Sequence, residues 1–273
     1  MALETGDFRL DGGAMMGSVP KVLWEITNPA DELNRINLSL RCMLLDNGEQ
    51  RVLIESGMGD KLDGSFLKRF HIKQTSHPLK GALDLFGYNI DDITHVILTH
   101  LHFDHAGGAT TIDSQGNITP TFPNAMYYVS TSNWEAGLYP SPRDSASYLD
   151  INYKCLEDSK QLRLLNEDES ILKDISTIMV HGHTNGQQLI RLDSGNETLV
   201  FCSDLIPLRS HIQLPWIMGY DLNAVLTLEE KTHFLDQAAK NNWWLWLYHD
   251  PNTVAIKIKK GKKYYDVIKE KLR

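Results

Sequence analysis

Cysteine is scarce in this sequence, and its few positions exclude a disulfide framework. Only Cys42, Cys155 and Cys202 are present, an odd number, widely spaced and without a Cys-x-x-Cys pair. A small secreted scaffold or a cysteine-ligated zinc module needs more cysteines at closer spacing. We therefore predict that each cysteine is a small buried apolar side chain.

Long apolar runs and an excess of positive charge are also missing. No uninterrupted apolar segment approaches the roughly 18 residues that a bilayer-spanning helix needs. The first residues, MALETGD, lack the basic start and apolar stretch of a signal peptide. Lys and Arg number 27 against 35 Asp and Glu, a net charge of −8. No general field attracts nucleic acid or anionic lipid, so we expect a cytoplasmic protein that binds neither nucleic acid nor membrane.

The sequence does contain enough apolar material for a sizeable core, arranged in short strands and a few helices. Hydrophobic residues make up 42% of the 273. The strands include a hairpin over 37–45 and 51–54 that turns at Asn47-Gly48, and a closing hairpin over 254–258 and 264–267. Helices are predicted over 78–87 and 227–241. Residues 109–160 are the least regular.

Two details of these elements are open to structural test. Thr227, with Glu230 at the third helical position, predicts the N-cap of the second helix. The basic run Lys257 to Lys263 in the closing hairpin is assigned to a solvated strand edge, where lysines prevent further pairing. A nucleic-acid patch is the alternative for that run.

One eleven-residue stretch, Leu98 to Gly108, concentrates the chemistry of the chain. Three of the 11 histidines fall within six residues, in His100-Leu101-His102-Phe103-Asp104-His105. The apolar run His95 to Leu98 predicts a buried strand that ends just before them, and alternation directs His100 and His102 to the same side. Imidazole and carboxylate together suit zinc, iron or manganese. The alternative is a histidine-rich polar loop.

The same arrangement, a predicted strand followed by a metal-ligand residue, recurs three times. His183, Asp204 and His249 each follow an apolar strand, as His100 does. Strand ends of a shared sheet can converge on one crevice. His181 lies two residues before His183 and is the alternative ligand there.

The spacing His100-x-His102-x-Asp104-His105 resembles the HxHxDH signature of the metallo-β-lactamase superfamily of dinuclear hydrolases. Residues 99–108 are most similar to its quorum-quenching lactonase and methyl-parathion-hydrolase branch. The resemblance implies an α+β fold, an αβ/βα four-layer sandwich. Two central mixed β-sheets would be flanked by helices, with the metal site at the strand ends along one edge. It also implies a single metallo-β-lactamase-like domain over residues 1–273.

The resemblance further implies a ligand set of seven residues around two divalent ions, zinc first, with manganese or iron as alternatives. Gly182-His183-Thr184-Asn185-Gly186 matches the family phrase Gly-His-Thr-x-Gly, which favours His183 over His181. One metal would be held by His100, His102 and His183, and the other by Asp104, His105 and His249, with Asp204 bridging them. Glu55 stands where the family usually carries Asp, which puts its supporting role in doubt.

From this we predict a metal-dependent hydrolase that cleaves an ester-like bond of a small molecule. A lactone is the first expectation and a phosphotriester the next, with attack by a hydroxide that the two metals share. Asp104 and Asp204 are the predicted catalytic residues, and His211 is a candidate substrate contact. The alternatives are a nuclease or phosphodiesterase of the same superfamily and a non-catalytic metal-binding protein. A homodimer is a further expectation, and residues 109–160 and 205–225 would carry specificity.

Overall fold

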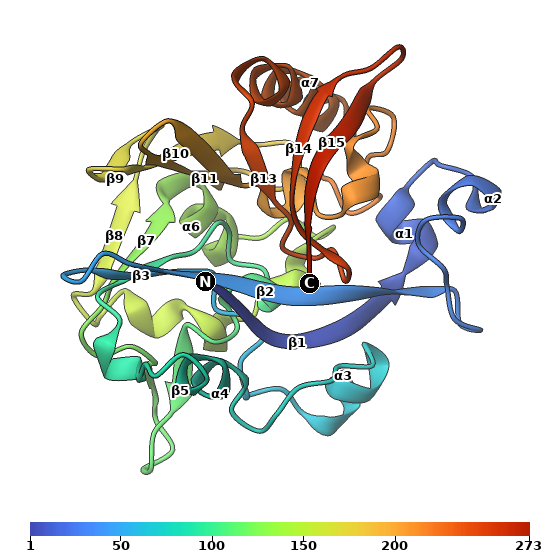
Figure 1. Ribbon diagram of the computed structural model, residues 1–273. Helices are drawn as coiled ribbons and strands as arrows, with labels where there is room; N and C mark the ends of the chain where they lie inside the picture. The colour runs from blue at the N-terminus through green and yellow to red at the C-terminus, as the bar shows by residue number, and fades with distance from the viewer. The chain divides into compact units, whose positions relative to one another are not determined.

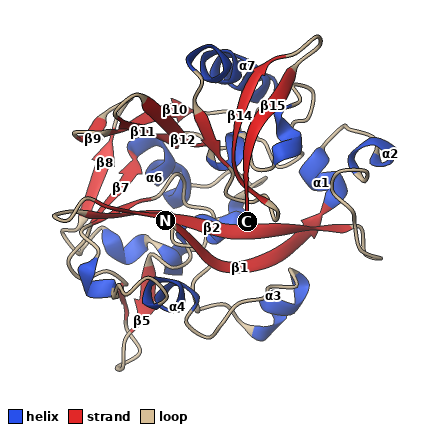
Figure 2. Ribbon diagram, viewed as in Figure 1, coloured by secondary structure: helices blue, strands red, loops and turns tan.

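The computed structural model describes residues 1–273, which form two compact units. Unit 1 contains residues 1–8 and 39–166, and unit 2 contains residues 9–38 and 167–273. Strands and short helices are interspersed along the chain (Figure 2). The prediction of a single domain over 1–273 stays a prediction.

A six-stranded sheet in the order β1-β2-β3-β4-β7-β8 supplies most of the regular structure of unit 1. β2 pairs antiparallel with β3, whereas β3, β4, β7 and β8 are parallel, so the sheet is mixed. A separate two-stranded sheet joins β5 to β6. The strand bounds are β1 (Ala2–Asp11), β2 (Arg35–Asp46), β3 (Arg51–Ile54), β4 (His95–Ile97), β5 (Thr110–Ile112), β6 (Ile118–Pro120), β7 (Met126–Ser130) and β8 (Leu162–Leu165).

A seven-stranded sheet in the order β15-β14-β13-β12-β11-β10-β9 lies in unit 2. Its neighbours are antiparallel except β12 and β13, which are parallel, so this sheet is also mixed. The bounds are β9 (Ser170–Leu172), β10 (Ile175–Val180), β11 (Gln187–Ser194), β12 (Glu197–Phe201), β13 (Trp244–Trp246), β14 (Thr253–Lys260) and β15 (Tyr265–Leu272). The predicted α+β class with two mixed sheets is confirmed.

Most helices are short. The α-helices are α1 (Gly12–Met16), α2 (Lys21–Trp24), α3 (Gly64–Arg69), α4 (Pro78–Asp84), α5 (Phe103–Ala106), α6 (Thr131–Leu138) and α7 (Ala224–Asn241). The 3-10 helices are η1 (Ile90–Asp92), η2 (Ser145–Ser147), η3 (Asp150–Asn152), η4 (Lys154–Leu156), η5 (Ser203–Leu205) and η6 (Arg209–Ile212). None of these helices is long and apolar enough to cross a membrane.

α7, the longest helix, covers part of the seven-stranded sheet and closes the core of unit 2. It lies beside β14 (Figure 1) and buries Phe234, Leu235 and Ala238. Val200, Leu245 and Ile256, from three adjacent strands, belong to the same apolar cluster. Burying such side chains is the main favourable term in folding, so this cluster fixes the strand ends that carry His183, Asp204 and His249.

The predicted hairpins are present, and two of the three cysteines are buried as expected. β2 and β3 pair Asp46 with Arg51 around the Asn47-Gly48 turn, where Gly48 has a positive φ of 91°. β14 and β15 form the closing hairpin. Cys42 and Cys202 are buried and Cys155 is half-buried, and all three are free thiols.

One local prediction was wrong, and a second was confirmed only in part, since Lys259, Lys260, Lys262 and Lys263 are exposed but Lys257 is not. The cap of α7 is Asn223, whose side chain accepts from the Leu226 N–H, while Thr227 lies buried inside the helix. Lys257 is not at a solvated edge, because β15 is the edge strand and Lys257 is buried beside Glu197, 2.7 Å from its carboxylate.

We expect Asn223→Ala to lower the free energy of unfolding by about 1 kcal/mol, because it leaves an N-terminal N–H of α7 without its acceptor. Chemical denaturation measures the change. Thr232→Ala, on the exposed side of the same helix, is the control and should shift stability by less than about 0.5 kcal/mol. Equal effects of the two substitutions would contradict the assigned cap.

Candidate metal centre

The first part of the centre is the loop that leaves β4 in unit 1. His100 and His105 are fully buried, and His102 and Asp104 nearly so. The His100 ring centroid lies 4.5 Å from that of His102 and 4.0 Å from that of His105. Three imidazoles so close together are stable as neutral rings, because protonating them would place like charges side by side away from water. Neutral imidazoles are the form that binds metal.

The turn after β3 holds this loop through its backbone. Ser56 N–H donates to the His105 carbonyl at 2.9 Å, and Gly108 N–H donates to the Gly57 carbonyl at 3.3 Å. A Cβ on Gly107 would stand 2.2 Å from the Met58 carbonyl oxygen, so only glycine fits there. The Gly107-Gly108 pair therefore allows the two backbone segments to approach closely.

Glu55 sets the orientation of His105. Its Oε1 lies 3.1 Å from His105 Nδ1, and both side chains are fully buried. Since a carboxylate can only accept, Nδ1 carries the hydrogen and Nε2 keeps a lone pair. Nε2 faces Asp104 Oδ2 at 3.7 Å. Glu55 thus supports the cluster despite being longer than the family's usual Asp.

Thr99 joins His100 to the same carboxylate. Its hydroxyl donates to Glu55 Oε1 and lies 3.0 Å from His100 Nδ1, from which it accepts. Glu55 adopts a left-handed backbone with a φ of 66°. Such strain in a non-glycine residue is retained where the surrounding contacts fix it, often at a functional site. One buried carboxylate therefore orients two histidines.

The second part of the centre lies within unit 2, where one carboxylate faces two imidazoles. Asp204 Oδ2 is 3.3 Å from His183 Nε2, and Asp204 Oδ1 is 3.2 Å from His249 Nε2. Asp204 is in η5, directly after β12, and the preceding Ser203 has a φ of 46°. His183 follows β10 and His249 follows β13. The three strand ends of this unit thus bring together the residues that the sequence indicated.

Asp221 orients His183 as Glu55 orients His105. Its Oδ1 accepts from His183 Nδ1 at 2.9 Å, and both residues are buried. The lone pair of His183 Nε2 therefore points at the lone pairs of Asp204. That contact is repulsive unless a positive charge lies between the two atoms.

These donor sets fit a divalent metal. Two ligand atoms about 2.0–2.2 Å from one ion in tetrahedral geometry stand roughly 3.3–3.6 Å apart. The three carboxylate–imidazole distances are 3.2, 3.3 and 3.7 Å. In unit 1, single donor atoms of Glu55, His100 and His105 all lie within 4.8 Å of one another. Nitrogen and carboxylate oxygen are ligands of zinc, manganese and iron.

The first half of α7 and the segment before it hold the loop that carries His183. Both oxygens of Glu230 accept backbone N–H groups, from His181 at 2.7 Å and from Gly182 at 3.0 Å. The Asn223 and Leu222 N–H groups donate to the carbonyls of residues 182 and 183 at 2.9 and 3.1 Å. A Cβ on Gly182 would lie 2.3 Å from Thr227 Oγ1. Glu230 was thus misassigned from sequence as part of a capping box.

His181 and His211 behave differently from the ligand set. His181 is exposed and bonds to Asn185 at 2.9 Å. His211 is buried, and its Nε2–H donates to the Met15 carbonyl at 3.1 Å. Burial, together with the nearby charge of Lys231, lowers the pKa of His211 to about 3. His211 is therefore a neutral imidazole near Asp204 and His249, whose charges also act on it.

Lys231 braces the segment that follows His211. Its buried ammonium donates to the carbonyls of Gln213 and Trp216 at 3.1 and 2.6 Å, and burial lowers its pKa to about 7. Residues 205–225 are therefore attached to α7 by Lys231.

Four further histidines lie outside the ligand set. His71 and His95 are half-buried, and His77 and His233 are exposed.

Comparison with known proteins decides the family. The model of the metallo-β-lactamase superfamily matches residues 39–249, which contain all seven predicted ligands. The chain belongs to the metallo-β-lactamase superfamily. A probable metal-dependent hydrolase from Staphylococcus aureus has a crystal structure similar to this one, with a TM-score of 0.91 and 29% identity over 100% of this chain and 96% of that one. Membership confirms the predicted family and supports the predicted class, a metal-dependent hydrolase.

Other similar members of the superfamily are lactonases. The N-acyl homoserine lactonase of Bacillus cereus is 24% identical over 61% of this chain and 63% of its own length. AiiA of Bacillus thuringiensis subsp. kurstaki, also an N-acyl homoserine lactonase, is 26% identical over 58% and 60%. The match thus spans less than two thirds of these relatives. AidC, a dizinc quorum-quenching lactonase, shares the fold, with a TM-score of 0.82 at 20% identity over 100% of this chain and 94% of AidC.

The neutral state of His211 is testable. Because the folded protein keeps this imidazole uncharged while the unfolded chain protonates near its ordinary pKa of about 6.5, its contribution to stability is lost as pH falls from about 6.5 toward 3. Nitrogen-15 NMR of the ring should show a proton on Nε2 and no titration between pH 8 and 5. A His211 midpoint near pH 6 would contradict the assignment.

Proposed function

We propose that this chain is a hydrolase with two divalent metal ions that cleaves an ester-like bond of a small molecule, with a lactone as the first expectation. The observation that carries the proposal is the Asp204 carboxylate, whose two oxygens each face a different imidazole. A carboxylate that links two nitrogen ligands in this way suits a bridge between two cations. The lactonase relatives support the substrate class, and phosphotriesters come second.

In this proposal the seven side chains form one centre. His100, His102 and His183 would hold one ion, and Asp104, His105 and His249 would hold the other, with Asp204 available to both. The hydrogen bonds of Glu55 and Asp221 support the assignment, because they leave the Nε2 lone pairs of His105 and His183 available as ligands. Zinc is the proposed metal, since histidine and carboxylate donors suit it and a similar fold is a dizinc lactonase.

Bound divalent ions would polarise the scissile carbonyl and make water acidic enough to act as a nucleophile near neutral pH. The chain's own residues then have distinct tasks. Asp204 orients the attacking water and accepts its proton at an Oδ atom. Asp104 contributes the second negative charge and holds the position of its ion against His105. The buried walls around the histidines exclude bulk water, which strengthens these charge interactions.

Segment 205–225 is the proposed source of specificity. It starts directly after Asp204 and contains Asp221, so its conformation is coupled to two carboxylates of the centre. Ile206, Leu208 and Ile212 are buried, and they pack as core within unit 2. The homodimer and the cytoplasmic location stay predictions.

The substrate class is tested with a panel of a lactone, a phosphotriester and a structured RNA, assayed with zinc or manganese. We expect lactone hydrolysis to be fastest, phosphotriester hydrolysis slower and RNA cleavage absent. A chelator should remove the activity, and added metal should restore it. Cleavage of RNA alone would overturn the proposed class.

Asp204→Ala should lower kcat/KM by about 10²–10³-fold or more, because it removes both the shared ligand and the proton acceptor. Elemental analysis should show reduced metal content in the same variant. The exposed Asp174→Ala in unit 2 is the matched control and should keep wild-type rates. Unchanged turnover in the Asp204 variant would exclude this mechanism.

Asp221→Ala should weaken metal binding by about 10–100-fold, because the partner that fixes the His183 tautomer is lost. Asp221→Asn keeps an acceptor oxygen and should fall between this variant and the wild type. Competition with a chromophoric chelator measures the affinity, and thermal unfolding checks the fold. Equal metal affinity in all three proteins would show that Asp221 is only a structural residue.

A further inference from the structure

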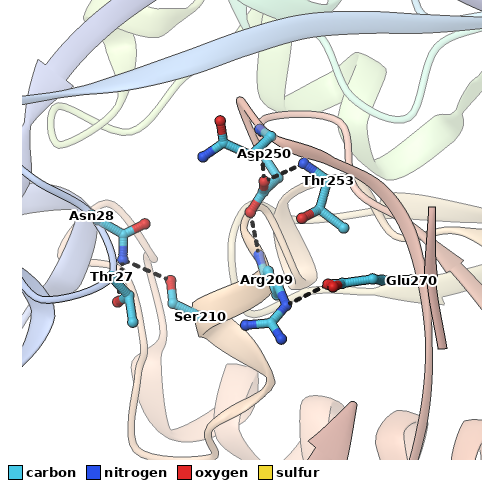
Figure 3. Close-up of a pocket in the computed structure, with 8 residues that line it drawn as sticks. Thr27, Asn28, Arg209, Ser210, Asp250, Thr253 and Glu270 are labelled. Atoms are coloured by element: carbon cyan, nitrogen blue, oxygen red, sulfur yellow. Dashed lines mark hydrogen bonds and ion pairs between the residues drawn. The ribbon is translucent and has the colours of Figure 1, made fainter. Parts of the chain in front are cut away.

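A polar cleft in unit 2, outside the ligand set, has a volume of about 380 Å³. This is within the range of small-molecule pockets. Every residue that lines it is polar or charged: Thr27, Asn28, Arg209, Ser210, Asp250, Asn252, Thr253 and Glu270. Figure 3 shows the Arg209 side chain between Ser210 and Glu270, with Asp250 and Thr253 next to its backbone. None of these residues has a task in the proposed hydrolysis.

The two carboxylates of the cleft are already engaged. Asp250 accepts three backbone N–H groups, from Arg209 at 2.8 Å, Asn252 at 3.0 Å and Thr253 at 2.7 Å. Glu270 Oε2 lies 3.2 Å from Arg209 Nε. The Asp250 carboxylate therefore fixes the two backbone turns that form the cleft, and Glu270 holds the guanidinium in place.

The cleft also contains hydrogen-bond donors that are not used within the chain. With Nε of Arg209 paired to Glu270, the two Nη groups have no partner in the chain. Ser210 Oγ accepts from Asn28 Nδ2 at 3.1 Å, which leaves its own O–H free to donate. The two Nη groups of an arginine form a fork that matches the two oxygens of a carboxylate. A lining with these donors is suited to an oxyanion.

The charges of the lining residues determine which oxyanion the cleft favours. One guanidinium stands against two carboxylates, of which Asp250 is offset locally by its three backbone N–H donors. The remaining negative charge repels a doubly charged ligand more strongly than a singly charged one. A singly charged carboxylate fits better than doubly charged phosphate or sulfate. The volume leaves room for a chain of several atoms behind the carboxylate.

We propose that this cleft binds a small monocarboxylate through the Nη fork of Arg209 and the hydroxyl of Ser210. The link to the reaction rests on the proposed function, because hydrolysis of an ester or lactone releases a carboxylate. The site also adjoins the catalytic side of unit 2, since Asp250 follows His249 directly and Arg209 lies two residues before His211. Occupancy would therefore act on the two segments that carry His211 and His249.

The test is a titration of the nitrogen-15-labelled full-length protein, followed by backbone amide shifts. 4-Hydroxybutanoate is the probe, with 1,4-butanediol as its neutral counterpart and inorganic phosphate as the dianion. We expect saturable shifts at residues 209, 210, 252 and 253 with 4-hydroxybutanoate, weaker ones with phosphate and none with the diol. Shifts confined to residues 183, 204 and 249 would overturn the proposal, as would tighter binding of phosphate.

Variants assign the binding to the fork. Arg209→Ala should weaken 4-hydroxybutanoate binding by about tenfold, and Arg209→Lys nearly as much, because lysine keeps the charge but loses the paired donors. Glu270→Gln should strengthen binding severalfold. Arg191→Ala is the matched control, since Arg191 in the same unit also pairs with an acidic neighbour, Asp193, but lies outside the cleft.

Wild-type affinity in the Arg209→Ala protein would overturn the proposal, and thermal unfolding checks that each variant is folded. The measurement involves no turnover. An active hydrolase without these shifts would contradict only the carboxylate site, and an inactive protein that shows them would contradict only the proposed hydrolysis.

Discussion

The contact between the Asp204 carboxylate and two imidazole nitrogens requires positive charge between atoms that would otherwise repel one another. A proton on Nε2 could supply that charge for one carboxylate–imidazole pair only, whereas one divalent cation can satisfy several of these donor atoms at once, so the arrangement suits a cation better. His105 shows the same design with Glu55 and Asp104. In both, an outer carboxylate sets the tautomer and an inner carboxylate faces the remaining lone pair. The rest of the centre depends on this orientation of the imidazoles, with Nδ1–H toward the outer carboxylate and the Nε2 lone pair toward the inner one.

Holding the imidazoles in this orientation requires backbone conformations that are unfavourable on their own. Glu55 and Ser203 both have left-handed φ values, and each lies at or beside a carboxylate of the centre. Gly107 and Gly182 pack against other atoms so closely that a methyl group would not fit. Such positions cost roughly 1–3 kcal/mol each when strained, and the sheets and α7 provide the packing that offsets this cost. Stability is thus given up locally to hold the ligands in place.

The inner residues of the centre could be predicted from sequence, whereas of the outer ones only Glu55 was indicated, by its place in the family pattern. His100 to His105 lie within six residues after a strand, so local spacing and the family motif identify them. Asp221 is 38 residues from His183, and no pattern connects the two. Glu230 had a misleading local pattern, because Thr227 and Glu230 resemble a capping box while the actual cap is Asn223. Asp221 and Glu230 act through hydrogen bonds to residues far away in the sequence, and the spacing of residues contains no information on such contacts.

Unit 2 is formed from two separate parts of the chain, and this affects how the protein folds during synthesis. Residues 9–38 belong to unit 2, yet the rest of that unit begins only at residue 167. During synthesis at about 5–20 residues per second, the early segment emerges many seconds before its partners. Vectorial folding, one unit after the other, is therefore not available to unit 2. The apolar side chains of its early segment, including Met15, Met16 and Trp24, must stay unaggregated until residues 167–273 have been made.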